Sequence, residues 1–168
     1  MINDHLIFSE EALTMLQSLE GYKLYPYDDT TGKPIREWNI HATIGYGYLI
    51  SEKEWRNFKH GISQKIATDL LTKIIPHFEE VVRKYIIVPL AQNQFDALVI
   101  FVYNIGPNAF KKSSVVKMVN DRRAATKYPT LELAWKAWNK QNHSVIPGLV
   151  NRRRIEWDLY ANGQYLVA

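Results

Sequence analysis

The sequence predicts an α+β fold that is mostly α-helical, with a small antiparallel sheet lobe and a larger helical lobe. Apolar residues at helical spacing open the chain, and aromatic and glycine-spaced segments typical of β-strands occupy residues 22–50. Helical signals dominate from residue 51 onward. A helix, a small sheet and a run of helices within 168 residues indicate two lobes of one domain, with a ligand cleft expected between them.

The first helix is expected to begin after Ser9 and to end at Gly21. Ser9 can cap it, and two glutamates follow in the first turn, where the helix dipole favours acids. Glu20 falls in the last turn, where the negative end of the dipole disfavours an ionised carboxylate. Four apolar residues share one buried face of this helix: Ala12, Met15, Leu16 and Leu19.

Residues 22–50 are expected to form a small twisted antiparallel sheet. The run "YKLYPY" is aromatic, "DDTTGK" has turn chemistry, and "ATIGYGYLI" is a β-like run with spaced glycines. Pro26 suits an edge strand because proline cannot donate a ladder hydrogen bond. Residues 33–41 are expected to extend the hairpin, and the sheet lobe as a whole covers about residues 21–60.

The helical lobe is expected to cover about residues 61–168 together with the N-terminal helix. A capping box of Ser51 and Glu54 starts a short helix, and Ser63 starts a long one toward Tyr85, with a kink or restart at Pro76. Further helices are expected over residues 91–105, 114–120, 122–127, 131–140 and 147–162. The first of these is apolar nearly all round, so it is expected to be the central buried helix.

Composition limits the classes of function. The chain has no cysteine, which excludes disulfides and cysteine-based sites, and its five histidines show no short metal-ligand spacing, so no metal site is expected. The longest apolar run, Ala97–Val102, is too short to span a membrane, and the N-terminus lacks the features of a signal peptide. We therefore expect no stable membrane insertion, no signal or anchor, and a monomer by default.

The net charge of +4 favours an anionic partner, which could be nucleic acid, a membrane surface or an acidic polymer such as a cell wall. The basic residues are scattered along the chain and do not form one stripe. Solvated helix faces explain such scattered charges better, so a nucleic-acid partner is not expected.

Three carboxylates near the start of the chain are candidates for catalysis. Glycoside hydrolysis needs one protonated and one ionised acidic group on opposite sides of the scissile bond, so the two need unlike environments. Glu20 lies beside apolar residues and Asp29 lies in a polar turn. Spacing alone leaves open a helix-end acid followed by a structural Asp28–Asp29 turn, and it does not say which aspartate would act.

The segment "LEGYKLYPYDDTTGKP…ATIGYGYLI" resembles the catalytic motif of the phage-type lysozymes, glycoside hydrolase family 24. The motif of that family is Glu-Gly, an Asp nine residues after the Glu, and a Thr in "TIGYGH". The residues here are Glu20, Asp29 and Thr43. The segments "PLAQNQFDALVIFVYNIGPNAF" and "AWKAWNK…IPGLVNRRRIEWDLY" resemble later parts of the family, so the likeness spans residues 19–160. It implies one lysozyme-like, two-lobed domain over residues 1–168.

The resemblance also implies roles for individual residues. Glu20 would be the general acid, Asp29 would act on the opposite face of the sugar, and Thr43 would help to hold the attacking water. The family is similar to the inverting T-even phage lysozyme, so carboxyl groups about 6.5–9.5 Å apart are expected. Substrate contacts are implied at four further positions: Leu49, Tyr103, Asn104 and Ser113.

Two features of the sequence depart from the family's pattern. Tyr48 stands where the family has the histidine of "TIGYGH", and residues 33–41 lengthen the segment between Asp29 and Thr43. An arginine of "NRRR", Arg152 or Arg153, is expected to pair with Glu20 or to support the cleft. The alternative is an Arg152–Glu156 pair on a solvated helix face.

Five aromatic residues fall into two groups. Those in the last third of the chain recur at helical spacing and are expected in the core: Trp135, Trp138 and Trp157. In the sheet lobe, Trp38 and Tyr46 are candidates for stacking on a sugar ring.

The leading hypothesis is a muramidase that hydrolyses the β-1,4 bond between N-acetylmuramic acid and N-acetylglucosamine in bacterial peptidoglycan. Carboxylates can carry out the proton transfers, so no cofactor is expected. The alternatives are a lytic transglycosylase and a non-catalytic peptidoglycan-binding module. The resemblance implies a protein made in the host cytoplasm and acting on the periplasmic wall, and a free endolysin, a tail-associated lysozyme and a delivered toxin all fit it.

Overall fold

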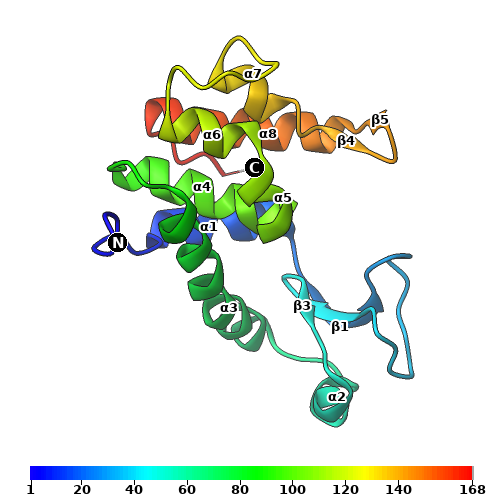
Figure 1. Cartoon of the computed structure of the whole chain (residues 1–168). Helices are drawn as coiled ribbons and strands as arrows, with labels where there is room; N and C mark the ends of the chain where they lie inside the picture. The colour runs from blue at the N-terminus through cyan, green and yellow to red at the C-terminus, as the bar shows by residue number, and fades with distance from the viewer. Residues whose placement is uncertain (168) are drawn as a thin grey trace. The chain divides into compact units, whose positions relative to one another are not determined.

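The computed structural model describes residues 1–167, and the chain divides into two compact units. The sheet unit is Gln17–Pro76, and the helical unit comprises Met1–Leu16 and the chain from His77 onward. Figure 1 shows the order of the elements along the chain. The α+β class predicted from the sequence is confirmed: a small antiparallel sheet is combined with a predominantly helical chain.

Two helices pass from one unit into the other. Helix α1, Glu10–Glu20, begins after Ser9, whose Oγ accepts a hydrogen bond from the Ala12 amide at 3.1 Å, and it ends before Gly21, as predicted. Helix α3, Gln64–Tyr85, also begins where predicted, but it runs through Pro76 as one helix and does not restart there.

The sheet unit contains a three-stranded antiparallel sheet in the order β1-β2-β3, where the strands are Lys23–Asp28, Ala42–Gly45 and Tyr48–Leu49. Pro26 lies in the edge strand β1, as predicted. Gly45 and Gly47 have φ angles of +66° and +90°, a left-handed backbone that glycine adopts readily, and they turn β2 back into β3. The pairing places Tyr27 opposite Thr43 and Thr43 opposite Leu49.

Residues 33–41 extend the hairpin less than predicted. Their pairing with β1 is an isolated bridge between Tyr27 and Pro34, flanked by hydrogen bonds from the Ile35 amide to the Pro26 carbonyl at 3.1 Å and from the Asp28 amide to the Lys33 carbonyl at 2.9 Å. Pro34 has no amide hydrogen for a ladder, so a regular strand cannot propagate through it. The rest of the segment is irregular.

The core of the sheet unit forms around three buried side chains from β2 and the residue that follows β3: Ala42, Ile44 and Ile50. The 3₁₀ turn Glu52–Glu54 and helix α2, Trp55–Phe58, follow this core. The predicted capping box is confirmed, because the Ser51 amide and hydroxyl donate to Glu54 Oε2 at 3.1 and 2.7 Å.

Helix α4, Gln92–Ile105, is the central helix of the helical unit, as predicted. Its residues Phe95–Val102 are all buried, and it packs on helix α8, Pro147–Asn162. Helices α5, α6 and α7 complete this unit and span Pro107–Lys112, Ser114–Asn120 and Leu131–Lys136. Gly163 ends α8 in a left-handed conformation with φ +67°.

Two predictions for the helical unit are wrong. Residues 122–127 form turns and irregular structure instead of a helix, and the Thr126 hydroxyl donates to the Tyr128 carbonyl at 3.2 Å within them. The helix that Thr130 caps ends at Lys136, and a two-stranded hairpin of β4, Lys140–Gln141, and β5, Ser144–Val145, follows it. Side-chain bonds to the backbone compete with helix formation in the first segment.

Helices long and apolar enough to cross a lipid bilayer do not occur in residues 1–167.

Candidate active site

The side chain of Asp28 is occupied by its own turn. Its Oδ1 accepts hydrogen bonds from the amides of Thr30 at 2.9 Å and Thr31 at 3.3 Å, and also from the Thr30 hydroxyl. Its Oδ2 accepts from Asn39 Nδ2 at 3.2 Å. These donors, the Thr30 hydroxyl first, lower the pKa of Asp28. Asp28 is therefore the structural member of the aspartate doublet.

The carboxylate of Asp29 faces a different environment. Its side chain is 46% exposed, and its Oδ1 lies 3.4 Å from His41 Nδ1. The Asp29 amide donates to the His41 carbonyl at 3.1 Å, which fixes the backbone at the end of β1. The oxygens of Asp28 are thus engaged by hydrogen bonds, whereas the carboxylate of Asp29 faces solvent and one imidazole.

Thr43 is hydrogen-bonded to the same carbonyl, that of His41. It is buried at 3% exposure in β2, and its hydroxyl donates to the His41 carbonyl at 2.9 Å. A threonine hydroxyl that has used its one proton keeps its oxygen lone pairs as acceptors for a water molecule. His41 therefore fixes the Asp29 backbone and the Thr43 side chain through one oxygen atom, a contact that sequence reasoning missed.

Tyr27 is a second residue that sequence reasoning missed. It lies opposite Thr43 in the pair of β1 and β2, so these two side chains leave the same face of the sheet, and Asp29 follows two residues later, just beyond the end of β1. Burial raises the pKa of Tyr27, and the negative charges of Asp29 and Glu20 raise it further. Both carboxylates therefore act on one phenol. The period-two spacing of Tyr27 and Asp29 is the signal that could have identified it.

Glu20 is the last residue of α1 and is half-buried, which agrees with its predicted place beside the buried face of the helix. Gly21 follows with φ +59°, and its amide donates to the Gln17 carbonyl at 3.0 Å. A left-handed glycine here turns the chain directly from the helix into β1. Glu20 and Asp29 are thus carried by adjoining elements of the sheet unit.

The remaining predicted residues of the sheet unit differ in exposure. Leu49 is 57% exposed and pairs with Thr43 across β2 and β3. Tyr46 is buried at 5% exposure with its ring 5.5 Å from that of Tyr22, so the prediction that it stacks on a sugar is wrong. Trp38 is half-buried, and its Nε1 donates to the Ile50 carbonyl at 2.8 Å.

Three predicted substrate-contact residues belong to the helical unit. Tyr103 is half-buried with its ring 5.0 Å from that of Phe78, and Asn104 is exposed at the end of α4. Ser113 is buried, and its Oγ accepts from the Val116 amide at 3.1 Å, which caps α6. Substrate contact at these positions stays a prediction.

The arginines of "NRRR" take part in a buried network centred on Glu156. Arg153 Nη1 donates to the two Glu156 oxygens at 2.7 and 2.6 Å, and Arg152 Nε donates to one of them at 3.1 Å. Trp135 Nε1 donates to the same carboxylate at 3.0 Å, and Arg153 Nη2 donates to Asn104 Oδ1. The Arg152–Glu156 pair of the alternative therefore exists, but it does not lie on a solvated helix face, because Glu156 is fully buried.

Two of the three predicted core tryptophans, Trp135 and Trp138, hydrogen-bond to this network. Trp135 is fully buried with its ring 4.7 Å from that of Phe101. Trp138 and Trp157 are half-buried, and their rings lie 6.1 Å from Phe101 and 6.0 Å from Trp135. The prediction that these three residues pack in the core is confirmed fully for Trp135 and partly for the other two.

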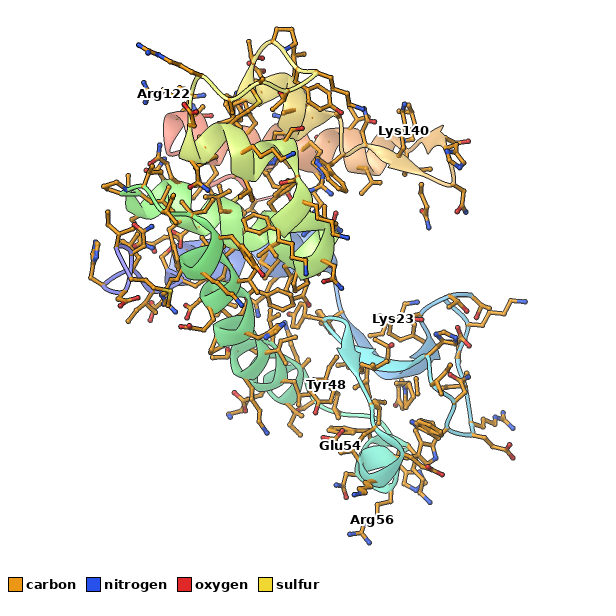
Figure 2. The ribbon with its side chains drawn as sticks, viewed as in Figure 1. Lys23, Tyr48, Glu54, Arg56, Arg122 and Lys140 are labelled. Carbon is orange, nitrogen blue, oxygen red and sulfur yellow. The ribbon has the colours of Figure 1, made fainter. Side chains whose placement is uncertain are left out.

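Tyr48, at the position of the family's histidine, forms a hydrogen bond of its own. Its hydroxyl donates to Glu54 Oε1 at 2.7 Å (Figure 2). The carboxylate acceptor raises the pKa of Tyr48 to about 12. The Ser51 and Tyr48 hydroxyls, in that order, lower the pKa of Glu54. Tyr48 thereby joins the end of the sheet to the capping box that starts the next turn.

Groups of three or more histidine, aspartate or glutamate side chains arranged to hold a metal ion do not occur in the described part of the chain.

Comparison with known proteins identifies relatives along nearly the whole chain. The phage lysozyme family matches residues 17–156. The chain is 36% identical over 158 residues to the endolysin of Bacillus phage PZA, covering 92% of this chain and 55% of that protein. It is 30% identical over 154 residues to the endolysin of Salmonella phage P22, covering 90% of this chain and 96% of that protein. The chain thus spans about half the length of the Bacillus phage relative.

Solved structures show the same fold. The endolysin from Escherichia coli O157:H7 phage FAHEc1 matches with a TM-score of 0.79 at 32% identity, covering 96% of this chain and 98% of that one. The muramidase domain of SpmX from Asticaccaulis excentricus matches with a TM-score of 0.75 at 28% identity, covering 94% and 99%. The resemblance predicted from the sequence is therefore confirmed, and the chain belongs to the phage lysozyme family.

Proposed function

We propose that this chain is a muramidase that hydrolyses the β-1,4 bond between N-acetylmuramic acid and N-acetylglucosamine in bacterial peptidoglycan. The observation that supports the proposal is that the Asp29 amide and the Thr43 hydroxyl donate to one carbonyl, that of His41, while the charges of Asp29 and Glu20 both raise the pKa of Tyr27, in a chain of this family. A net charge of +4 favours binding to an anionic wall polymer.

In the proposed mechanism, Glu20 donates its proton to the glycosidic oxygen as the bond to the anomeric carbon breaks. Asp29, ionised, accepts a proton from the water that attacks that carbon from the opposite face. The Thr43 oxygen accepts the second hydrogen of the same water and orients it. The anomeric configuration inverts, and a separation of about 6.5–9.5 Å between the two carboxyl groups leaves room for the water.

We propose four residues as contacts for the substrate. Leu49 offers an exposed apolar side chain next to Thr43, and Asn104 offers an amide whose oxygen is oriented by Arg153. Tyr103 and Ser113 are proposed to contact or support the glycan chain. Peptidoglycan is the proposed partner, with no nucleic acid, no stable membrane insertion and a monomeric state.

The proposed place of action is the periplasmic cell wall, after synthesis in the cytoplasm of a bacterial host. Chemistry carried by carboxylates needs no cofactor, which is compatible with release into that compartment.

The decisive experiment measures the clearing of permeabilised Gram-negative cells by Glu20→Gln, with Glu10→Gln as the matched control on the same helix. We expect Glu20→Gln to lower the rate about 10²–10⁴-fold, the usual contribution of a general acid, while the exposed Glu10 variant clears like the parent. Equal clearing by both variants would show that Glu20 is not the acid.

A second comparison separates the two aspartates. Asp29→Asn is expected to abolish clearing at an unchanged melting temperature. Asp28→Asn is expected to lower the melting temperature, because an amide cannot accept all of the hydrogen bonds of the turn. The reverse pattern would assign catalysis to Asp28.

Mass spectrometry of the released sugars separates hydrolysis from transglycosylation. Hydrolysis by the parent leaves hydrated muramic acid ends. Ends with a 1,6-anhydro ring would instead establish a lytic transglycosylase, which needs one acid and no water activation.

A further inference from the structure

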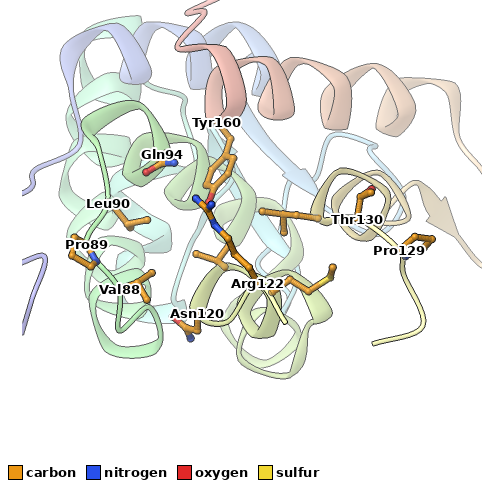
Figure 3. Close-up of a pocket in the computed structure, with 12 residues that line it drawn as sticks. Val88, Pro89, Leu90, Gln94, Asn120, Arg122, Pro129, Thr130 and Tyr160 are labelled. Carbon is orange, nitrogen blue, oxygen red and sulfur yellow. The ribbon is translucent and has the colours of Figure 1, made fainter. Parts of the chain in front are cut away.

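The helical unit contains a cavity of about 500 Å³ that the proposed mechanism does not use (Figure 3). Its walls come from the start of α4 and the loop before it, the end of α6, the start of α7, and α8. Gln94, Arg122, Thr130 and Tyr160 contribute polar groups, and Leu90 and Met118 contribute apolar ones. The side chains that line the cavity, all within the described chain, include none that is acidic.

Arg122 brings a positive charge to this cavity. Its guanidinium makes no ion pair or hydrogen bond with any of residues 1–167. The two acids nearest in sequence to the lining are engaged elsewhere, since Asp121 accepts from the Arg123 amide at 2.9 Å and Glu132 pairs with Lys136. The cation is therefore available to an anion from outside the chain.

Tyr160 adds a second donor beside the guanidinium. Figure 3 shows the Arg122 side chain directed at the end of the Tyr160 ring, and the charge of Arg122 acts on the phenol. Burial nevertheless raises the pKa of Tyr160, so its hydroxyl stays protonated and can donate. The ring is fixed by stacking on Trp157 at 5.5 Å and by contact with Trp135 at 5.1 Å.

Gln94 adds a third donor, and its orientation is set by the fold. Its Oε1 accepts from the Ala91 amide at 3.0 Å in the first turn of α4. This bond turns the amide nitrogen of the side chain outward, and Figure 3 shows the group directed toward Tyr160. Thr130 behaves similarly, because its Oγ1 accepts from the Leu133 amide at 3.2 Å and keeps its own proton for donation.

We propose that this cavity binds an organic carboxylate with a small apolar body, such as the C-terminal end of a short peptide. The carboxylate lies on the Arg122 guanidinium in the two-pronged geometry that carboxylates and arginine share. Tyr160 and Gln94 donate to it from the other side, and Leu90 and Met118 face the apolar body. If the proposed function holds, the peptides of the wall are a source of such carboxylates, and that identification alone rests on the proposed function.

The test is a titration of the intact chain with N-acetyl-D-alanyl-D-alanine, followed by two-dimensional NMR of the backbone amides. We use the Glu20→Gln background so that the result is independent of wall hydrolysis. Shifts are expected at the amides of residues 88, 90–94, 118–122 and 130–131 and at Tyr160, with a dissociation constant of about 1 mM or below. Arg122→Gln is expected to weaken binding at least about tenfold, as loss of a hydrogen bond to a charged group does.

Arg123→Gln is the matched control, because it removes the same charge one position along the chain from a residue outside the cavity lining. It should bind like the parent. Equal weakening by the two variants, or equal binding of the uncharged dipeptide amide, would overturn the proposal. Equal or tighter binding of inorganic phosphate would also overturn it, because the site would then be a general anion site.

Discussion

At the scale of single residues, the aspartate doublet shows what spacing cannot decide. Asp28 and Asp29 are adjacent and chemically identical in the sequence. They differ because Asn39, eleven positions away, and two threonines of the turn all donate to Asp28. The turn itself and one contact from an irregular segment together separate the two roles, and the spacing of the two aspartates does not show which of them the turn engages.

Tyr27 is the residue where the structure adds most to the candidate site, and Tyr27→Phe tests it. The raised pKa keeps its phenol neutral, so the hydroxyl can stabilise ionised carboxylate groups nearby. Without the hydroxyl we expect slower clearing and an acidic limb of the rate profile moved to higher pH, by up to about one unit. The measurement is the pH dependence of clearing beside the melting temperature.

Tyr25→Phe is the control for that experiment, because Tyr25 lies on the same strand and is 67% exposed. It should leave the profile unchanged. A Tyr27→Phe variant with an unchanged pH profile and only a lower melting temperature would show a purely structural role.

Tyr48 gives a second prediction, on stability. The folded pKa of Tyr48 is raised from 10.0 to about 12, so the stability that its bond contributes is complete below pH 10 and is lost as pH rises through about 12. The folded pKa of Glu54 is lowered from 4.5, so its contribution is present above that pH and is lost as pH falls through the lowered value. The bond is thus intact across the neutral range.

Tyr48→Phe is therefore expected to lower the free energy of unfolding by about 1 kcal/mol at pH 7, the usual net value of one such hydrogen bond. Tyr48→His restores the family's residue and should introduce a stability change near pH 6.5, where histidine titrates. Urea unfolding from pH 5 to 9 measures both. If the free energy of unfolding of the Tyr48→His variant does not change with pH over this range, a charged pair between the introduced imidazole and Glu54 is excluded.

At the scale of elements, the sequence predicts those whose ends carry chemical signals. Ser9 and Gly21 bound α1, Thr130 starts α7, and Gly163 ends α8, all where expected. The β4–β5 hairpin carries no such signal, because its strands have two residues each and its turn is Asn142–His143 instead of a glycine-containing pair. The prediction therefore extends the preceding helix to residue 140, past its end at Lys136.

This hairpin supplies the third prediction. Asn142 and His143 have φ angles of 49° and 66°, a left-handed backbone that costs a side-chain-bearing residue about 1–2 kcal/mol and that asparagine tolerates better than histidine. His143→Gly is expected to raise the free energy of unfolding by about 0.5–1 kcal/mol after the extra entropy of glycine in the unfolded chain is subtracted. Asn142→Gly should raise it less, and a larger gain from Asn142→Gly in urea unfolding would contradict this account.

At the scale of the whole molecule, long-range polar contacts connect the ends of the chain to the central helix. Asp96 in α4 is fully buried, and its carboxylate accepts from the Ser9 amide at 3.1 Å and the Ser9 hydroxyl at 2.6 Å. It also accepts from the Tyr165 hydroxyl at 2.7 Å. The segment before α1 and the segment after α8 therefore share one anchor. The sequence indicates α4 as the central helix. It does not indicate that the carboxylate of Asp96 in this helix accepts hydrogen bonds from segments near both ends of the chain.

Tyr165→Phe tests this anchor. Burial raises the pKa of Asp96, while the Ser9 and Tyr165 hydroxyls oppose the rise by stabilising the ionised form. Because the folded pKa is raised, the carboxyl favours folding most when protonated, and that contribution is lost as pH rises through the folded pKa. The Tyr165 bond offsets part of this loss only while Asp96 is ionised. Its removal should therefore cost about 1–3 kcal/mol of unfolding free energy at pH 7 and less at pH 4. Urea unfolding of parent and variant at the two pH values measures the difference, and an equal cost at both would mean that Tyr165 contributes by packing alone.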